Sequence, residues 1–369
     1  MGTKNEKVGK LKQVISSINK DKKYREDGND DEPLVGIITQ MDANVETISS
    51  GSLVLDGILG GGFAKGRIIE IYGKPSSGKT SIAISTAANV QKDGGTAVYI
   101  DVENAFDPNY AQALGVNLDE LFFAQPASAE QALDLVADLT DSGMVDLIVV
   151  DSVAALVPKA VLEGNAEDLT VGALARLMSK QVSKLIRSAS KRGTTVIFIN
   201  QTRDKIGGFS PFGTPQETPG GQALKFYSSQ RVEIKKGQPV TGANKDDVIG
   251  TEMNIVNRKN KIAPPFRKGS TVITYAKGIN RAAEMISEAP KYGVIEKPNA
   301  RKYLTFDGEL IGNSKADAIE KLENDKAMFD KLSNRLREVL KSNAMVDSGV
   351  KDEEEQDAKE DKSIESNKE

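Results

Sequence analysis

The octapeptide GKPSSGKT at residues 73–80 constrains the fold of this chain more than any other feature. It matches the pattern G-x-x-x-x-G-K-[ST], whose glycines let successive backbone amides converge on an anion. The apolar residues 68–72 before it predict a strand, and residues 81–88 predict a helix, which disfavours a chance match in a glycine-rich turn. A strand, a glycine-rich loop and a helix in this order bind nucleotide phosphates. The predicted contacts are Gly73, Lys74, Pro75, Ser76, Ser77, Gly78, Lys79, Thr80 and Ser81, with Lys79 at the β- and γ-phosphates and Thr80 at a Mg²⁺ ion.

The composition removes several kinds of chemistry. Among 369 residues there is no cysteine and no histidine, which excludes disulfides, thiolate metal sites, cysteine nucleophiles and histidine-based catalysis. Proton transfer must then fall to carboxylates, lysines or water. No apolar run is long enough for a membrane span, and no apolar segment follows the polar residues 1–10. We therefore expect a cytoplasmic protein without a membrane partner.

The acidic charge of the chain is concentrated in residues 347–369. This tail contains ten acidic residues and four lysines, a net charge of −6 in a chain whose total is −4. Because it has neither aromatic residues nor an apolar period, we expect it to be disordered. Either it only keeps the protein soluble, or it competes with DNA for a basic surface.

The chain divides into four predicted segments. Residues 1–42 hold one short amphipathic helix, which packs on its own domain or on a neighbouring subunit, and a charged linker. Residues 43–282 alternate strands and helices, which predicts an α/β core with a mainly parallel sheet. Residues 283–346 predict a small α+β domain with one charged helix over residues 315–341, and the acidic tail follows. The predicted core strands are residues 68–72, 97–101, 147–151, 195–200 and 231–235, and the predicted helices include residues 130–140 and 172–192.

Polar residues follow three of these strands at their carboxyl ends, where ligands of parallel sheets bind. We predict that Asp151, together with Thr80, binds the water shell of Mg²⁺. An aspartate that only caps the following helix would stand at the same place in the sequence. Glu103 is the candidate general base for a water that attacks the γ-phosphate, with an ordinary loop acid as the alternative. Gln201 carries an amide that either contacts the γ-phosphate and reports its loss or only forms a turn.

Two polar loops are candidate nucleic-acid contacts. Residues 202–222 contain five glycines, three prolines and two phenylalanines in a setting too polar for burial. Loops of this length are typically functional or disordered, and their aromatic side chains can stack on bases. Residues 162–172 precede a helix whose basic residues either follow phosphates or form an ordinary solvated face. The candidates are Arg203, Lys205, Phe209 and Phe212 in the first loop, and Arg176, Ser179 and Lys180 on the helix.

In this order, these segments closely resemble the bacterial RecA recombinase family. The resemblance covers about residues 45–280 and, more weakly, residues up to about 340. Its most specific stretches are ETISSGSLVLD at 46–56, GRIIEIYG at 66–73, IDVENAFDPNYA at 100–111, VDLIVVDSVAALVPKA at 145–160, FINQTRDKIG at 198–207, GGQALKFYSS at 220–229 and KNKIAPPF at 259–266. Together they are far more specific than the phosphate loop alone.

The resemblance implies a P-loop core of RecA type and an activity. The expected protein is a DNA-dependent ATPase that uses ATP and Mg²⁺, forms a helical filament on single-stranded DNA and exchanges strands with homologous double-stranded DNA. Such proteins act in DNA repair and in the SOS response to DNA damage; whether this chain promotes repressor cleavage stays open.

The resemblance also assigns roles to residues. It implies that Glu103 is the catalytic carboxylate and that Gln201 links the state of the γ-phosphate to the loop after it. It implies that Lys259 and Lys261 reach the ATP site of a neighbouring subunit, where two cations would neutralise the charge that develops in phosphoryl transfer. The adenine would be framed by Asp107, Tyr110 and Tyr275, and the DNA backbone would be contacted by Arg176, Ser179, Gly220 and Gly221.

The chain departs from the family pattern at several positions. Lys74 and Pro75 replace the usual Pro-Glu of the phosphate loop, Ser183 replaces a common Arg, and Gln216 replaces a Glu. These departures put nucleotide turnover and DNA coupling in question and favour a divergent copy carried by a mobile element over a cell's main recombinase. A hexameric helicase or motor on the same core is the alternative, which would form closed rings and lack KNKIAPPF. A non-catalytic mediator with a degenerate ATP site is disfavoured by the intact Lys79, Thr80, Glu103 and Asp151.

Overall fold

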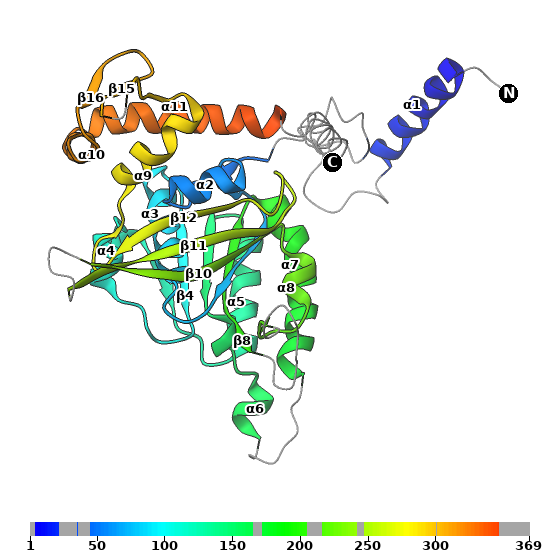
Figure 1. Ribbon diagram of the computed structural model, residues 1–369. Helices are drawn as coiled ribbons and strands as arrows, with labels where there is room; N and C mark the ends of the chain where they lie inside the picture. The colour runs from blue at the N-terminus through cyan, green and yellow to red at the C-terminus, as the bar shows by residue number, and fades with distance from the viewer. Residues whose placement is uncertain are drawn as a thin grey trace, which may run out of the picture. The chain divides into compact units, whose positions relative to one another are not determined.

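The computed structural model describes residues 4–21, 35, 45–164, 172–204, 216–241, 247–299 and 301–346 (Figure 1). The chain separates into two units, residues 1–46 and 47–369. The first contains helix α1 (Lys4–Lys20), which confirms the predicted amphipathic helix. Near its end the Asn19 side-chain amide donates to the carbonyl of Val35 at 2.8 Å and accepts from its N–H at 3.0 Å. The four segment boundaries proposed above stay predictions.

The second unit is built on a nine-stranded sheet of order β13-β12-β11-β10-β3-β7-β6-β4-β5 (Figure 1). Its parallel part confirms the predicted α/β fold. It consists of β3 (Ile68–Gly73), β4 (Ala97–Asp101), β5 (Phe122–Ala124), β6 (Leu147–Asp151), β7 (Thr195–Gln201) and β10 (Gln230–Thr241). The antiparallel strands β11 (Val248–Asn260), β12 (Lys268–Thr274) and β13 (Gly278–Ile279) extend it beyond the predicted strands.

Two apolar layers cover the faces of this sheet, because alternate residues of each strand point to opposite sides. Ile197 and Ile199 pack with α2 (Leu53–Leu59) and α3 (Lys79–Lys92). Val196 and Phe198 pack with α5 (Ala129–Ser142), α7 (Ala173–Arg192) and α8 (Ala223–Tyr227). The shorter elements of this unit are β1 (Thr47–Ile48), β2 (Phe63–Ala64), α4 (Pro108–Ala113), η3 (Leu118–Glu120), η4 (Val153–Ala155), α6 (Lys159–Glu163), β8 (Arg203–Asp204) and β9 (Gln216–Glu217).

The C-terminal part is α+β, as predicted. It contains α9 (Arg281–Glu288), η5 (Ala289–Tyr292), a three-stranded sheet of β14 (Ile295–Glu296), β15 (Tyr303–Thr305) and β16 (Leu310–Gly312), and the helices α10 (Lys315–Asn324) and α11 (Lys326–Val346). The prediction of one helix over residues 315–341 was wrong. Asp325 breaks it with φ −112° and ψ 83°, and its carboxylate accepts from the N–H of Met328 at 3.0 Å, which caps the second helix.

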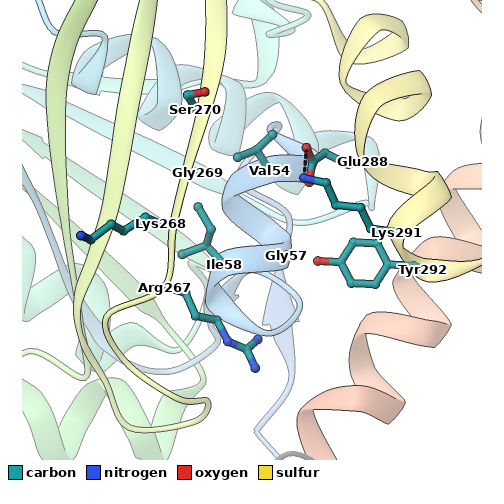
Figure 2. A pocket seen from close by; sticks show the side chains of 10 residues that line it. All are labelled: Val54, Gly57, Ile58, Arg267, Lys268, Gly269, Ser270, Glu288, Lys291 and Tyr292. Carbon is teal, nitrogen blue, oxygen red and sulfur yellow. Dashed lines mark hydrogen bonds and ion pairs between the residues drawn. The ribbon is translucent and has the colours of Figure 1, made fainter. Parts of the chain in front are cut away.

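Glu284 of α9 joins the C-terminal part to the core. Its Oε1 accepts from the Ser52 hydroxyl and its Oε2 from the N–H of Leu53, each at 2.7 Å, so it satisfies the first turn of α2. Beside this junction lies a hollow of about 730 Å³ between α2, β12 and η5 (Figure 2). Lys291 and Glu288 form an ion pair of 2.8 Å at its rim. None of the predicted site residues lines it.

No helix in the described ranges has both the length and the apolar character that a membrane span requires.

Candidate nucleotide and DNA sites

The predicted phosphate loop leaves β3 and enters α3 at the carboxyl edge of the parallel strands. Two of its glycines leave no room for a side chain. A Cβ on Gly73 would lie 2.0 Å from the carbonyl oxygen of Ile234, and one on Gly78, where φ is 95°, would lie 2.1 Å from the sulfur of Met253. Glycine at these two positions therefore lets the loop pack closely on β10 and β11, and the loop ends at the N-terminus of α3, where the helix dipole favours an anion.

Polar groups of the loop are arranged as a phosphate would require. The buried Ser77 hydroxyl has no hydrogen-bond partner within the described part of the chain. The Lys79 ammonium, in a side chain only 6 % exposed, donates to the carbonyl of Lys74 at 2.8 Å, a residue of its own loop. Burial lowers the pKa of Lys79, and the charges of Asp151 and Glu103 oppose that shift. A phosphate fits this cradle because it would supply an acceptor for Ser77 and a counter-charge for Lys79.

Asp151, at the end of β6, faces the first turn of α3. Its Oδ2 accepts from the Thr80 hydroxyl at 2.8 Å and from the Tyr99 hydroxyl at 2.7 Å. Burial raises the pKa of Asp151, while these hydrogen bonds favour its ionised form. Its hydrogen bonds run to side chains, so the geometry favours the role of metal ligand over that of helix cap. An ionised carboxylate beside a hydroxyl is a fitting donor set for the water shell of Mg²⁺.

The tips of β4 and β7 meet at Glu103 and Gln201. The Gln201 side-chain amide donates to Oε1 of Glu103 at 2.7 Å, although the two residues are 98 positions apart. The hydroxyl of Ser152 donates to the same oxygen in a short hydrogen bond. Glu103 is exposed to solvent, so water can reach its carboxylate. The structure thus brings the predicted base and the predicted amide together.

Two tyrosines line the hollow beside the loop. This space of about 280 Å³ is bounded by residues 76–81 and by Tyr110 and Tyr275, and the Tyr110 hydroxyl lies 2.8 Å from that of Ser81. Asp107 is not among the lining residues. Its carboxylate caps α4 by accepting from the N–H groups of Asn109 at 2.9 Å and Tyr110 at 3.2 Å. Its predicted contact with adenine stays a prediction.

Lys259 and Lys261 do not line this hollow. The Lys259 ammonium donates to the carbonyls of Lys225 and Phe226, each at 2.8 Å, at the end of α8. Burial lowers the pKa of Lys259, and the neighbouring Lys261 and Arg231 lower it further. The Phe226 side chain beside it is 70 % exposed. Neither lysine therefore lies against the hollow beside the phosphate loop of its own chain.

The described part of the predicted DNA site gathers around α7. Arg176, Ser179 and Lys180 are exposed on its first turns. Gly220 and Gly221 pack against the same turns with φ of 85° and 73°. A Cβ on Gly221 would lie 2.7 Å from that of Ala175, and one on Gly220 would lie 3.0 Å from Val153. Arg203 is exposed in β8, whereas Lys205, Phe209 and Phe212 lie outside the described residues.

Some site residues were missed by the sequence reasoning. Tyr99 holds Asp151 and Ser152 holds Glu103, and both lie within two residues of a strand tip, which is the signal that marks them. Thr251, Ile273 and Ala276 line the hollow from β11 and from β12 and the residues that follow it. They were missed because these strands were not predicted, although the alternation of apolar residues in 251–256 indicates one.

Comparison with known proteins places these features in a family context. A family model described as the RecA N-terminal domain matches residues 11–280. Protein RecA of Borrelia hermsii (strain HS1 / DAH) is 48 % identical over 297 residues, which cover 80 % of this chain and 82 % of that protein. Protein RecA of Mesomycoplasma hyopneumoniae (strain 7448) is 45 % identical over 334 residues, which cover 90 % and 95 %. Among solved structures, the RadB recombinase matches with a TM-score of 0.47 and 25 % identity, over 63 % of this chain and 98 % of that chain.

Proposed function

This chain belongs to the RecA recombinase family, and from that premise we propose that it binds ATP with Mg²⁺ and assembles as a helical filament on single-stranded DNA in the cytoplasm. The filament then pairs its strand with homologous double-stranded DNA and exchanges strands, and DNA stimulates the hydrolysis of ATP to ADP and phosphate. The observation that carries the proposal is the convergence of three strand tips, Asp151, Glu103 and Gln201, on one phosphate loop.

Each group around the loop has a separate task in this proposal. The loop amides and the Ser77 hydroxyl bind phosphate oxygens, and the Lys79 ammonium exchanges the carbonyl of Lys74 for the β- and γ-phosphates. Thr80 and Asp151 would hold the hydrated metal. When bound, Mg²⁺ neutralises phosphate charge and orients the leaving group. Proton transfer falls to Glu103, which is exposed to water and accepts the proton of the attacking molecule.

Gln201 is proposed to report the state of the nucleotide. Its side-chain amide now donates to Glu103 at 2.7 Å, and a γ-phosphate would offer a competing, more highly charged acceptor. Transfer of this donor from Glu103 to the phosphate releases the carboxylate for proton transfer. It also moves Gln201, the residue directly before the loop 202–222. Loss of the γ-phosphate reverses both changes.

Lys259 and Lys261 are proposed to complete the ATP site of a neighbouring subunit. Lys259 lies on β11 and Lys261 follows the end of that strand, and the exposed ring of Phe226 beside Lys259 makes this surface suited to bury apolar area against another copy. Two cations supplied in trans neutralise the charge of the transition state as an arginine finger does. ATP binding and assembly then reinforce one another, because each stabilises the interface that the other needs.

The DNA contacts are proposed to be made by Arg176, Ser179, Lys180, Arg203, Gly220 and Gly221, with Lys205, Phe209 and Phe212 outside the described residues. Contacts of basic groups and backbone amides with phosphates do not read sequence. Homology is then read by base pairing itself.

ATP hydrolysis with and without single-stranded DNA tests the activity, and electron microscopy with ATP and DNA tests the assembly. We expect strong stimulation by DNA and open helical filaments. Closed rings would favour the helicase or motor, and absence of hydrolysis would favour the mediator.

A further inference from the structure

A buried carboxylate without a role in hydrolysis lies on the strand that leads to the phosphate loop. Glu70 of β3 is 0 % exposed and shares the face of Ile68, which packs with α7 and α8. Its Oε1 accepts from the Asn200 side-chain amide at 3.0 Å, and its Oε2 accepts from Arg231 at 2.5 Å. A buried charge is retained only with such partners, so Glu70 fixes both side chains in position.

Asn200 makes three of the four hydrogen bonds that its amide group can form. Its Nδ2 donates to Glu70 and also to the carbonyl of Pro219 at 3.1 Å, and its Oδ1 accepts from the N–H of Gln201 at 2.9 Å. Asn200 is itself fully buried. One side chain therefore contacts Gln201, the predicted reporter of the γ-phosphate, and Pro219, which directly precedes Gly220 and Gly221.

Arg231 extends this network toward the lysines of the subunit interface. Its guanidinium lies over the ring of Tyr72 at 4.6 Å, one residue before the phosphate loop. In the sheet, Arg231 of β10 is the register partner of Lys259 of β11. Glu70 thus connects the strand before the phosphate loop, the segment at Gln201 and the strand of Lys259.

We propose that Glu70 and Asn200 form a positioning clamp that couples DNA contact at Gly220 and Gly221 to Gln201; this rests on the function proposed above. Movement of Pro219 would leave a buried N–H of Asn200 without its acceptor, so Asn200 turns and draws its Oδ1 away from the N–H of Gln201. Conversely, a shift of Gln201 on phosphate binding displaces Pro219. Glu70 keeps the two events linked because its hydrogen bond holds the Asn200 amide in the resting orientation, in which that amide contacts Pro219 and Gln201 together.

The clamp predicts that its variants lose DNA stimulation while ATP binding persists. Glu70→Gln keeps the shape but cannot accept from both Asn200 and Arg231, and Asn200→Asp removes both donors. We expect the DNA-stimulated kcat to fall about tenfold or more in each, with a KM for ATP within about twofold of wild type. The two variants test the same clamp independently, so Asn200→Asp decides the matter if Glu70→Gln does not fold.

Asn257→Asp is the matched control. Asn257 of β11 is also fully buried, and its side-chain amide donates to the carbonyls of Ile58 and Pro264, each at 3.4 Å. Its amide donates to neither Gln201 nor Pro219. DNA should therefore stimulate ATP hydrolysis by Asn257→Asp as strongly as by wild type, when rates are expressed per folded molecule.

Three results would overturn the clamp. If DNA stimulates ATP hydrolysis equally in wild type and in a folded clamp variant, the clamp does not couple the two sites. If Asn257→Asp loses as much DNA stimulation as the clamp variants, the loss is a general effect of burying an extra acid. If wild type itself hydrolyses ATP without regard to DNA, the proposed function fails and the clamp fails with it.

Discussion

The nucleotide site and the junction with the C-terminal part each contain a buried carboxylate, Asp151 in one and Glu284 in the other. Burial raises the pKa of both, and for Glu284 to about 7 from an ordinary 4.5. Their partners differ. The hydrogen bonds of Asp151 within the described residues all reach Oδ2, whereas Glu284 uses Oε1 for Ser52 and Oε2 for Leu53, with Thr271 as a further partner.

On the function proposed above, this difference separates a carboxylate held for a ligand from one held for the fold. Asp151 has acceptor capacity left on Oδ1, so on the proposed function its burial cost is offset fully only when a cation binds. The carboxylate of Glu284 already has hydrogen-bond partners at the N-terminus of α2, so no ligand is needed to explain its burial. Variants at the first site should therefore change turnover, and variants at the second should change stability.

Lys79→Ala should have the largest effect. Removing the one buried ammonium of the phosphate loop should lower ATP turnover by about ten thousandfold, in the range found when a cation is withdrawn from phosphoryl transfer. Steady-state ATPase rates with DNA measure it. Lys92→Ala, in the last turn of the same helix, with a side chain 53 % exposed, is the control and should keep wild-type rates. A similar loss in both would mean that α3 has been disrupted.

Glu103→Gln should bind ATP but lower its hydrolysis by about a thousandfold, because the amide keeps the shape of the side chain and cannot accept a proton. Equilibrium binding of a fluorescent ATP analogue and single-turnover hydrolysis separate the two steps. Glu120→Gln, at an exposed acid of η3, should change neither. Full DNA-stimulated hydrolysis by Glu103→Gln would remove Glu103 from its proposed role.

Glu284→Gln should alter stability and leave ATP hydrolysis unchanged. With a pKa of about 7 in the folded protein and 4.5 as the ordinary value, Glu284 stabilises the fold most below pH 4.5, and this contribution is lost as the pH rises through 7. The difference between variant and wild type in the free energy of unfolding should therefore move by about 3 kcal/mol in favour of the variant between about pH 4.5 and pH 8. Denaturant titrations across this range measure it. If the difference in the free energy of unfolding did not change with pH, ionisation of Glu284 would not control the stability of the junction. Asp56, whose charge also raises the pKa of Glu284, or other groups would then control it.

The sequence predicted the strand tips well because their position is a local property. Asp151, Glu103 and Gln201 each follow an apolar run, and parallel strands bring such ends to one edge of a sheet. The helix that follows the phosphate loop was predicted from equally local features of the sequence. These residues could be named as candidates before any contact was known.

The remaining features depend on pairs that lie far apart in the chain. Arg231 and Glu70 are separated by 161 positions, and nothing near Glu70 distinguishes it from an edge-strand acid. The contact of Lys259 with the end of α8 depends on the pairing of β10 with β11, which was not predicted. The break at Asp325 was missed because its flanks are both amphipathic, and only the capping hydrogen bond reveals the new helix.

The smallest effect is expected at the junction, where Gly57 of α2 lies beside the Tyr292 hydroxyl in the lining of the hollow shown in Figure 2. An alanine Cβ at this position would lie 2.9 Å from that oxygen, so Gly57→Ala alone gains helix propensity but meets a contact that must give way. Removing the hydroxyl with Tyr292→Phe clears the space. In that background Gly57→Ala should raise the free energy of unfolding by about 0.5–1 kcal/mol, and in wild type by less. A double-mutant cycle by urea denaturation measures the coupling, and a cycle that closes with no interaction energy would mean that the junction already relaxes around the added methyl group.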